Sequence, residues 1–140
     1  MKIELSERMQ AVSALVPKGH VAADIGCDHG FVSIDLVQRS ICPHVYAADV
    51  CKGPLDRAKE HIAACGLKDK ITAVLSDGLK EVPVCGSGAD GFIAAGMGGK
   101  LIVSILTAVP KKTAQLSWCV LSPQSEIWLV RQALRELRFF

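Results

Sequence analysis

The sequence predicts an α/β fold, with a mostly parallel, doubly wound sheet of the Rossmann-like type. Short apolar stretches alternate with stretches of helical length, a glycine-rich turn directly follows the first of them, and acidic residues end several of them. Strands and helices that alternate in this way form right-handed βαβ units and build a parallel sheet. With 140 residues, half of them hydrophobic, we expect one domain over 1–140.

The individual elements follow from apolar spacing and from glycine and proline signals. Pro17 and Pro110 are expected to end helices, whereas Pro54 suits the first turn of one. In chain order we expect a helix over 5–17, a strand at 20–25, a helix over 30–40, a strand at 44–49, a helix over 53–66, strands at 70–77 and 88–96, a helix over 98–109, a strand at 116–122 and a helix over 127–137.

Five strands are fewer than the six or seven usual in doubly wound nucleotide-binding sheets. The chain also stops at Arg138-Phe139-Phe140, where the last helix would end on exposed aromatic side chains. We therefore expect the chain to be truncated before its last strands.

Neither the net charge nor the cysteine content indicates a nucleic-acid-binding, disulfide-rich or metal-binding protein. The net charge of +2 does not announce a nucleic-acid binder. We interpret most of the late basic residues as solvated helix faces, although they permit a local patch: Lys100, Lys111, Lys112, Arg131, Arg135 and Arg138. The six cysteines lack C-x-x-C spacing, and no signal peptide or membrane-spanning stretch is present. These features favour free thiols, no metal, no membrane and a cytoplasmic location.

The first strand runs into the segment D-I-G-C-D-H-G at 24–30. Gly26 and Gly30 match the outer glycines of a dinucleotide-binding fingerprint, but Asp28 replaces the middle one, which lets the backbone approach a pyrophosphate. A carboxylate there would repel phosphates and attract a cationic centre. S-adenosylmethionine fits, with Asp24 or Asp28 facing its sulfonium and ammonium groups, and NAD or FAD is the poorer alternative.

Two further acidic residues end the next strands. Asp49 follows the loop by about twenty residues, where a carboxylate accepts hydrogen bonds from both ribose hydroxyls. Asp77 and Gly78 end the third predicted strand, where a side chain or backbone amide can meet the adenine edge. Each Asp alone could be a helix cap or turn residue. Carboxylates at the ends of three successive strands favour a cofactor site.

The triplet Cys27-Asp28-His29 has other interpretations. A nucleophile needs its base within hydrogen-bond reach, and a metal site needs further ligands, which the neighbouring sequence does not supply. Cys27 is expected to pack in the turn. His29 opens toward the cofactor from the first turn of a helix and can be functional or merely structural.

A second glycine-rich segment, A-A-G-M-G-G at 94–99, ends the fourth predicted strand. It replaces the Asn- or Asp-Pro-Pro-aromatic motif with which many methyltransferases hold an exocyclic amine. Its glycines have no side chains to fill the space above the strand end, and their backbone amides can donate to a base or to the amino-acid end of a cofactor. A tight turn and helix start would explain Gly98 and Gly99, but not the whole run.

These residues resemble the bacterial tRNA (adenine(22)-N1)-methyltransferases, S-adenosylmethionine-dependent enzymes, over essentially the whole chain. The shared motifs are L-S-x-R at 5–8, V-P-x-G at 16–19, A-D-I-G-x-D-H at 23–29, V-x-x-G-P at 50–54, S-D-G-L at 76–79 and A-G-M-G-G at 95–99. The chain departs from the family pattern at Cys27, at Val32-Ser33, at Val74 and at Leu121-Ser122-Pro123-Gln124. The last two departures concern the substrate more than the cofactor. Members of the family also continue into further strands and a helical extension that grips tRNA.

The resemblance implies methyl transfer to the ring nitrogen N1 of a tRNA adenine, which must be unstacked or flipped to reach the site. That nitrogen has its own lone pair, so positioning matters more than a general base. We expect Asp28 and His29 to orient the adenine. Expected cofactor contacts are Asp24, Gly26, Asp28, Gly30, Asp49, Val50, Asp77, Gly78, Gly96 and Met97, and expected substrate contacts are Gly98, Gly99, Phe31 and Pro123. Phe31 could equally be a core aromatic.

Two other functions stay open at this point. The chain could belong to an S-adenosylmethionine-dependent methyltransferase of a small molecule or a protein, or it could be a non-catalytic nucleotide-binding module. The oligomeric state is not predicted.

Overall fold

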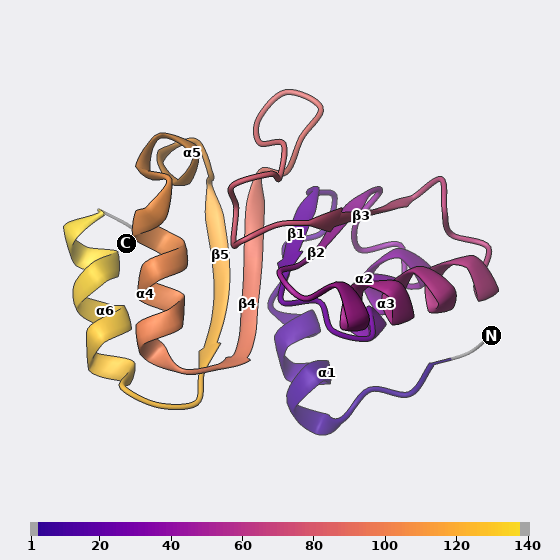
Figure 1. The fold of residues 1–140 in the computed structure, drawn as a ribbon, viewed down its shortest axis with the longest axis horizontal. Coiled ribbons are helices and arrows are strands. Elements are labelled where there is room, and N and C mark those ends of the chain that lie inside the picture. The colour runs from indigo at the N-terminus through magenta and orange to yellow at the C-terminus, as the bar shows by residue number, and fades with distance from the viewer. Residues whose placement is uncertain (1–2, 138–140) are drawn as a thin grey trace.

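A five-stranded parallel sheet runs through the middle of the molecule (Figure 1). The computed structural model describes residues 3–137, so the expected chain end at Arg138–Phe140 lies outside the described residues. The strands lie in the order β3-β2-β1-β4-β5. They are β1 (Ala22–Ile25), β2 (Val45–Asp49), β3 (Ile71–Leu75), β4 (Gly91–Met97) and β5 (Trp118–Pro123).

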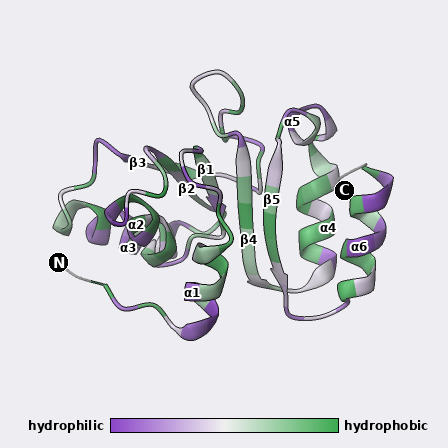
Figure 2. Ribbon diagram, turned by 180° about the vertical axis from the view of Figure 1, so that it is seen from behind, coloured by the Kyte–Doolittle hydropathy of each residue, from purple (hydrophilic) through white to green (hydrophobic). Residues whose placement is uncertain are grey.

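Helices cover both faces of the sheet, which confirms the predicted doubly wound Rossmann-like fold. One face carries α1 (Glu7–Ala14), α2 (Phe31–Gln38) and α3 (Lys52–Ala64). The other carries α4 (Gly99–Ala108) and α6 (Ile127–Glu136), and the short α5 (Pro110–Ala114) leads from α4 into β5. Figure 2 shows the strands as largely hydrophobic and the helices as two-sided. Alternate residues of each strand therefore supply two separate cores.

The order of the strands places the ligand site. The chain moves outward from β1 through β2 to β3 and then returns to β4 on the other side of β1. In such sheets the crevice at the carboxyl ends of the strands, where the order reverses, is the binding position. That position lies between the segments that follow β1 and β4, which are the two glycine-rich segments of the sequence.

The structure corrects one prediction about proline. Pro110 was expected only to end a helix, but it also begins α5, because a residue without an N–H fits the first helical position. Two residues later, Lys112 directs its Nζ to three backbone carbonyls at 2.7–3.0 Å, those of Leu79, Lys80 and Val82. This lysine therefore holds the loop after β3 and is not simply a solvated side chain.

Several elements are shorter than predicted. The first helix begins after Ser6, whose side chain accepts a hydrogen bond from the Met9 N–H, and ends at Ala14 instead of residue 17. The fourth strand begins at Gly91 instead of residue 88, because the chain before it forms a turn with a single bridge from Val84 to Ala89.

All six cysteines are free, as predicted. Over residues 3–137, no helix is long and apolar enough to cross a membrane.

Candidate functional site

The loop between β1 and α2 is held in a tight, left-handed conformation. Gly26, Asp28 and Gly30 have φ values of 71°, 52° and 79°. Only glycine adopts this region without strain, although Asp tolerates it better than most residues. A Cβ at Gly30 would lie 3.1 Å from the Cβ of Ala58, so this glycine also permits α2 to approach α3 closely. The outer glycines therefore have the structural roles that the fingerprint predicts, and Asp28 occupies the position of the middle one.

Asp49 ties this loop to the end of β2. Its Oδ2 accepts a hydrogen bond from the Asp28 N–H at 3.0 Å, and its Oδ1 accepts one from the Cys51 N–H at 2.9 Å. The residue is only 8% exposed, whereas Val50 beside it is 63% exposed. Each carboxylate oxygen has a second lone pair. Asp49 can therefore fix the loop and still accept hydrogen bonds from a ligand that lies over Val50.

Asp24 is a buried carboxylate at the end of β1. It is 6% exposed and accepts a hydrogen bond from the Ser33 hydroxyl at 2.8 Å. No lysine, arginine or histidine of residues 3–137 forms an ion pair with it. Burial raises the pKa of Asp24 from 3.8 to about 6. A ligand cation brought next to it would be stabilised by a charge that the protein leaves uncompensated.

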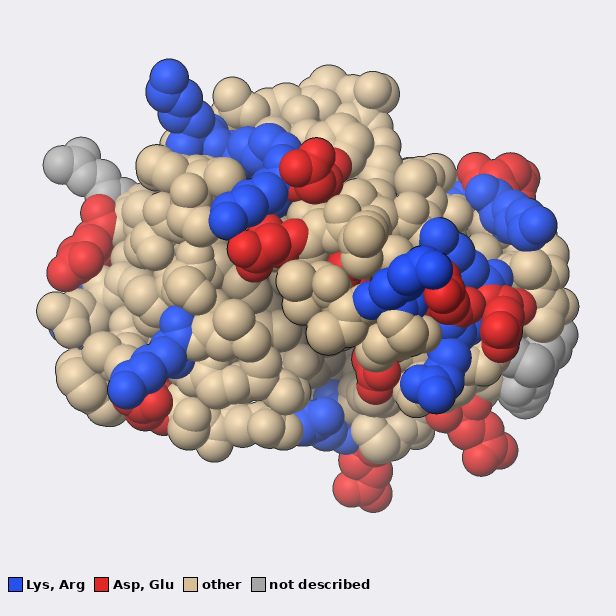
Figure 3. All heavy atoms as spheres, in the orientation of Figure 1, with Lys and Arg blue, Asp and Glu red and all other residues tan. Residues whose placement is uncertain are grey.

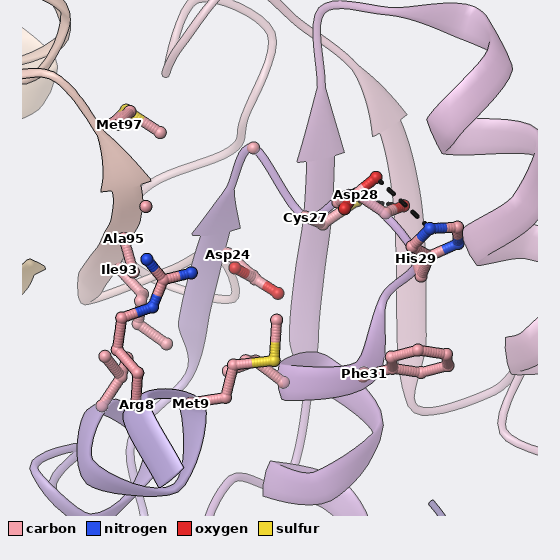
Figure 4. Close-up of a pocket in the computed structure, with 14 residues that line it drawn as sticks. Arg8, Met9, Asp24, Cys27, Asp28, His29, Phe31, Ile93, Ala95 and Met97 are labelled. Atoms are coloured by element: carbon pink, nitrogen blue, oxygen red, sulfur yellow. Dashed lines mark hydrogen bonds and ion pairs between the residues drawn. The ribbon is translucent and has the colours of Figure 1, made fainter. Parts of the chain in front are cut away.

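These loops enclose a pocket of about 230 Å³ between α1, α2 and the ends of β1 and β4 (Figure 4). Seven of the sequence-predicted site residues line it: Asp24, Gly26, Asp28, His29, Phe31, Gly96 and Met97. In Figure 4 the side chain of Asp24 points into the space between Arg8 and Met9, whereas His29 and Phe31 lie together at the other end.

The other predicted residues lie around the pocket. Gly30, Asp49 and Val50 belong to the loop and to the end of β2, as described above. Asp77 is exposed and forms an ion pair with Lys80 at 3.0 Å, and Gly78 packs near Ile105. The segment that follows β3 and contains Asp77 nevertheless lies close to the end of β2, because the N–H of the preceding residue, Ser76, donates to the Asp49 carbonyl at 2.9 Å.

The predicted substrate residues in the second glycine-rich turn pack against the residues that precede the N-terminus of α6. A Cβ at Gly99 would lie 2.5 Å from the Ser125 carbonyl oxygen, so Gly99 permits a close backbone approach. Gly98 lies near the Ser125 side chain, and Pro123 pairs in register with Met97. Gly98, Gly99 and Pro123 thus shape the turn without lining the pocket itself.

His29 belongs to a group of three rings at the mouth of the pocket. It stacks on Phe31 with ring centroids 5.6 Å apart, and the ring of His61 lies 4.9 Å from that of Phe31. The His29 Nε2 is 3.9 Å from the Asp28 Oδ1, which is too long for a hydrogen bond. His61 Nδ1 lies 2.8 Å from the backbone carbonyl of His29. The pair Asp28–His29 is therefore not preassembled as a proton relay, but His29 is held in place by α3.

Cys27 packs in the loop, as the sequence suggested. It is buried, and burial together with the nearby carboxylates raises the pKa of its thiol. Burial and the raised pKa both disfavour Cys27 as a nucleophile.

Two residues were missed as site residues: Arg8, which lines the pocket, and Gln124, which contacts Arg8. Arg8 projects from α1 into the pocket, and a Cβ at Gly96 would lie 3.1 Å from its Nη2. With the Gln124 amide oriented to suit its neighbours, its oxygen accepts from Arg8 Nη1 at 2.8 Å and its nitrogen donates to the Gly96 carbonyl at 3.3 Å. The available signals were the L-S-x-R motif and the departure at Gln124, but neither reveals that the two residues meet.

In the described part of the chain, no three His, Cys, Asp or Glu residues gather in a way that could hold a metal ion.

Comparison with known proteins gives the site its context. A curated relative, the tRNA (adenine(22)-N(1))-methyltransferase of Bacillus subtilis, is 32% identical over 138 residues, which are 99% of this chain and 57% of that protein. A Streptococcus agalactiae protein of the NADB-Rossmann superfamily superimposes with a TM-score of 0.92 at 33% identity, over 98% of this chain and 60% of that one. A candidate tRNA (m1A22) methyltransferase of Streptococcus pneumoniae, solved with S-adenosyl-L-methionine, gives 0.90 at 32% identity, over 95% and 62%.

The chain thus spans about three fifths of the length of these relatives. The similarity that the motifs indicated extends through the whole fold. A family model for the methyltransferase domain matches residues 5–140. The pocket at the switch point of the sheet is therefore set in a known type of catalytic domain, and the chain belongs to the methyltransferase domain family.

Proposed function

We propose that this chain is the S-adenosylmethionine-binding domain, over 1–140, of an enzyme that methylates N1 of an adenine in tRNA. The observation that carries the proposal is the loop after β1, where Asp28 replaces a glycine and its N–H is bound by Asp49 at 3.0 Å. The relatives named above support the same activity and the same cofactor. A cytoplasmic location, where tRNA is found, belongs to this proposal.

The residues present suit this cofactor chemically. Asp24 and Asp28 put two carboxylates beside the pocket and favour a cation, whereas a pyrophosphate would be repelled. The pocket of about 230 Å³ is smaller than those of roughly 300–1,000 Å³ that enclose whole ligands. We infer that it takes the methionine half, while the ribose reaches Asp49 and the adenine lies over Val50 and near Asp77 and Gly78.

When bound, the cofactor supplies an electrophilic methyl group. The chain's own residues would hold the target adenine in line with it, and catalysis would consist of alignment plus electrostatic stabilisation of developing positive charge. We propose Asp28 and His29 as the residues that orient the adenine, with Phe31 as its stacking partner. The turn over 96–99 and Pro123 would border the base.

The face of the molecule seen in Figure 3 gives no independent sign of RNA binding. In the view of Figure 3, basic and acidic side chains lie next to one another instead of forming one continuous basic area. A pocket lined by two Asp residues and one Arg would also accept a small-molecule or protein substrate. The choice of tRNA therefore depends on the relatives and needs a direct test.

That test uses the full-length protein with unmodified tRNA and radiolabelled cofactor. We expect 1-methyladenosine in the digested product and loss of methylation in Asp28→Ala. Asp69→Ala, in the exposed turn before β3, is the matched control and should keep full activity. Unchanged turnover in Asp28→Ala would remove Asp28 from the mechanism. Tight NADH binding without binding of S-adenosylmethionine in calorimetry would instead indicate a non-catalytic nucleotide-binding module.

A further inference from the structure

The outer edge of β3 is a surface that the proposed function leaves unused. Within residues 3–137, β3 is the last strand on its side of the sheet and pairs only with β2 (Figure 1). Its sequence, I-T-A-V-L, contains no charge and no proline, and its register against β2 runs without a bulge. Natural sheets usually protect an exposed edge with charges, proline, bulges or a covering element. An edge strand without these devices is a template for pairing with another strand.

The hydrogen bonds between β2 and β3 show which backbone groups of β3 face outward. The Val45 N–H donates to the Lys70 carbonyl at 3.0 Å at the start of the pair, and the Ser76 N–H donates to the Asp49 carbonyl at 2.9 Å at its end. In a parallel pair, alternate residues of a strand bond to the same neighbour. The even-numbered residues of β3 therefore face β2, and the odd-numbered residues turn their N–H and C=O groups to the free edge.

The outward groups of β3 match their own two-fold image. They belong to Ile71, Ala73 and Leu75, and the Ile71 N–H is already bound to the Leu67 carbonyl at 2.9 Å. When two β3 strands run antiparallel about a two-fold axis at Ala73, the two Ala73 residues exchange both of their hydrogen bonds. The Leu75 N–H of each copy then meets the free Ile71 carbonyl of the other. Leu75 is also 54% exposed, so this pairing would cover an apolar side chain.

A groove of about 570 Å³ runs between α3 and β3 beside this edge. Its apolar lining comes from Ile62 and Ala63 of α3 and from Ile71 and Ala73 of β3. Ile62 and Ile71 are buried, whereas Ala73 is half-buried and borders the open side. The edge therefore offers apolar contact as well as backbone hydrogen bonds to a strand that lies against it.

The charges of the groove are also self-complementary. Lys59 and Glu60 are adjacent, exposed residues of α3 that line it, and neither forms an ion pair within residues 3–137. A two-fold axis at Ala73 places the α3 helices of both copies antiparallel on the same face of the joined sheet. Lys59 of one copy then faces Glu60 of the other, and the arrangement repeats across the axis.

We propose that the β3 edge binds the β3 edge of a second copy of this chain, antiparallel about a two-fold axis at Ala73, so that two sheets join into one. A copy is favoured over another strand because both the outward backbone groups and the groove charges match their own two-fold image. The carboxyl ends of the strands point in opposite directions in the joined sheet, so each copy keeps its own pocket. The pairing requires neither a cofactor nor RNA.

The decisive experiment is sedimentation velocity of the full-length protein over the micromolar range, where the dimer fraction should rise with concentration. Ala73→Glu brings two carboxylates together at the axis and should weaken the dimer roughly tenfold or more, and Ala73→Lys should do the same with two ammonium groups. An equimolar mixture of the two variants places opposite charges at the axis and should restore the dimer. Ala108→Glu, an equivalent change at an exposed position of α4 on the other face, is the matched control and should dimerise normally.

Amide hydrogen exchange on the unmodified full-length protein tests the edge without any variant. The N–H groups of Ala73 and Leu75 should become more protected as the protein concentration rises, because only the dimer covers them. The Val74 N–H faces β2 and should be protected equally at every concentration, which makes it the internal control. This measurement decides the question even if a charge at residue 73 prevents folding.

A full-length protein that stays monomeric at every concentration would overturn the pairing. So would a dimer that Ala73→Glu leaves unchanged, or a mixture of folded Ala73→Glu and Ala73→Lys proteins that fails to restore it, because the contact would then lie elsewhere. Protection of the Ala73 and Leu75 amides that is independent of concentration would show that another segment of the full-length chain covers the edge, which also refutes the pairing. Each of these outcomes leaves the methyltransferase proposal intact, since tRNA methylation tests that proposal separately.

Discussion

The two glycine-rich turns lie side by side at the ends of paired strands but use their glycines differently. In the turn after β1, Gly26 and Gly30 provide left-handed backbone, and the loop is held by the buried carboxylate of Asp49. In the turn at the end of β4, Gly96 also has a positive φ of 75°, but Gly99 does not; Gly99 lies against the backbone of Ser125 and Glu126, and its N–H donates to the Ser125 carbonyl at 3.0 Å. Both turns contain left-handed glycines and hydrogen bonds, but a side-chain carboxylate holds the first, whereas the second is held by backbone hydrogen bonds and by a closer backbone approach at Gly99.

The two turns also differ in charge. Asp24 precedes the first turn, and its neighbour in register on β4 is the apolar Ile93. The second turn has no carboxylate of its own and receives the guanidinium of Arg8 over Gly96. The pocket between them therefore has an acidic wall and a basic wall. Similar glycine content thus says little about a turn until its neighbours are known.

The packing role of the second turn predicts the largest effect. In Gly99→Ala the new Cβ would lie 2.5 Å from the Ser125 carbonyl oxygen and 2.6 Å from that of Glu126, so backbone must move. We expect the free energy of unfolding to fall by about 3 kcal/mol. Gly98→Ala, which meets only the flexible Ser125 hydroxyl at 3.1 Å, should cost less than about 1 kcal/mol. Urea denaturation of both variants measures the difference, and equal losses would refute this packing role.

The acidic wall predicts the next effect. Because the pKa of Asp24 is raised to about 6 in the folded state, this carboxyl is more protonated in the folded than in the unfolded state between pH 3.8 and about 6. Stability of the ligand-free protein should therefore fall as the pH rises through this window. Asp24→Asn removes the ionised form and should raise the free energy of unfolding at pH 7 by about 1–3 kcal/mol, with no gain near pH 4. Denaturation curves across this range test it, and a gain independent of pH would contradict the role of ionisation.

The conformational role of the first turn predicts a smaller effect. Gly30→Ala combines a φ of 79° with a contact of 3.1 Å to Ala58, and we expect a loss of about 2 kcal/mol. Gly66→Ala is the matched control, since it has φ 69° but nothing within 4 Å of the added Cβ, and should lose only about 1 kcal/mol. Thermal unfolding compares the two, and a control that loses as much as Gly30→Ala would show that contact with α3 adds nothing.

The smallest effect concerns the thiol inside the first turn. Cys27 is buried with a raised pKa, whereas Cys51 and Cys85 are exposed. Iodoacetamide at pH 8 should label Cys51 and Cys85 in the native protein and leave Cys27 unmodified, as read by peptide mass spectrometry. Early labelling of Cys27 would mean that the loop opens readily, contrary to the hydrogen bonds that hold it.

Much of the fold follows from local signals. Apolar runs between glycine and proline signals predict each strand. Asp49 was expected to contact a ribose, which stays a prediction, and its 3.0 Å hydrogen bond to the Asp28 N–H emerges only from the structure. The helix that begins at Pro110 was missed because proline ends one helix and starts the next with the same properties. Lys112 was misread because its three carbonyl partners follow β3, about thirty residues earlier.

By itself, the sequence determined the parallel α/β fold, the glycine-rich loop at 24–30 and the acidic strand ends. These depend on backbone preferences and on periodicity, which operate over a few residues. Only the tertiary structure decided which side chains share the pocket. Arg8, Gly96 and Gln124 are separated by up to 116 positions, and they meet because β1, β4 and β5 are neighbours in the sheet and α1 crosses their ends. No local pattern records such a contact, since it arises from strand order and packing.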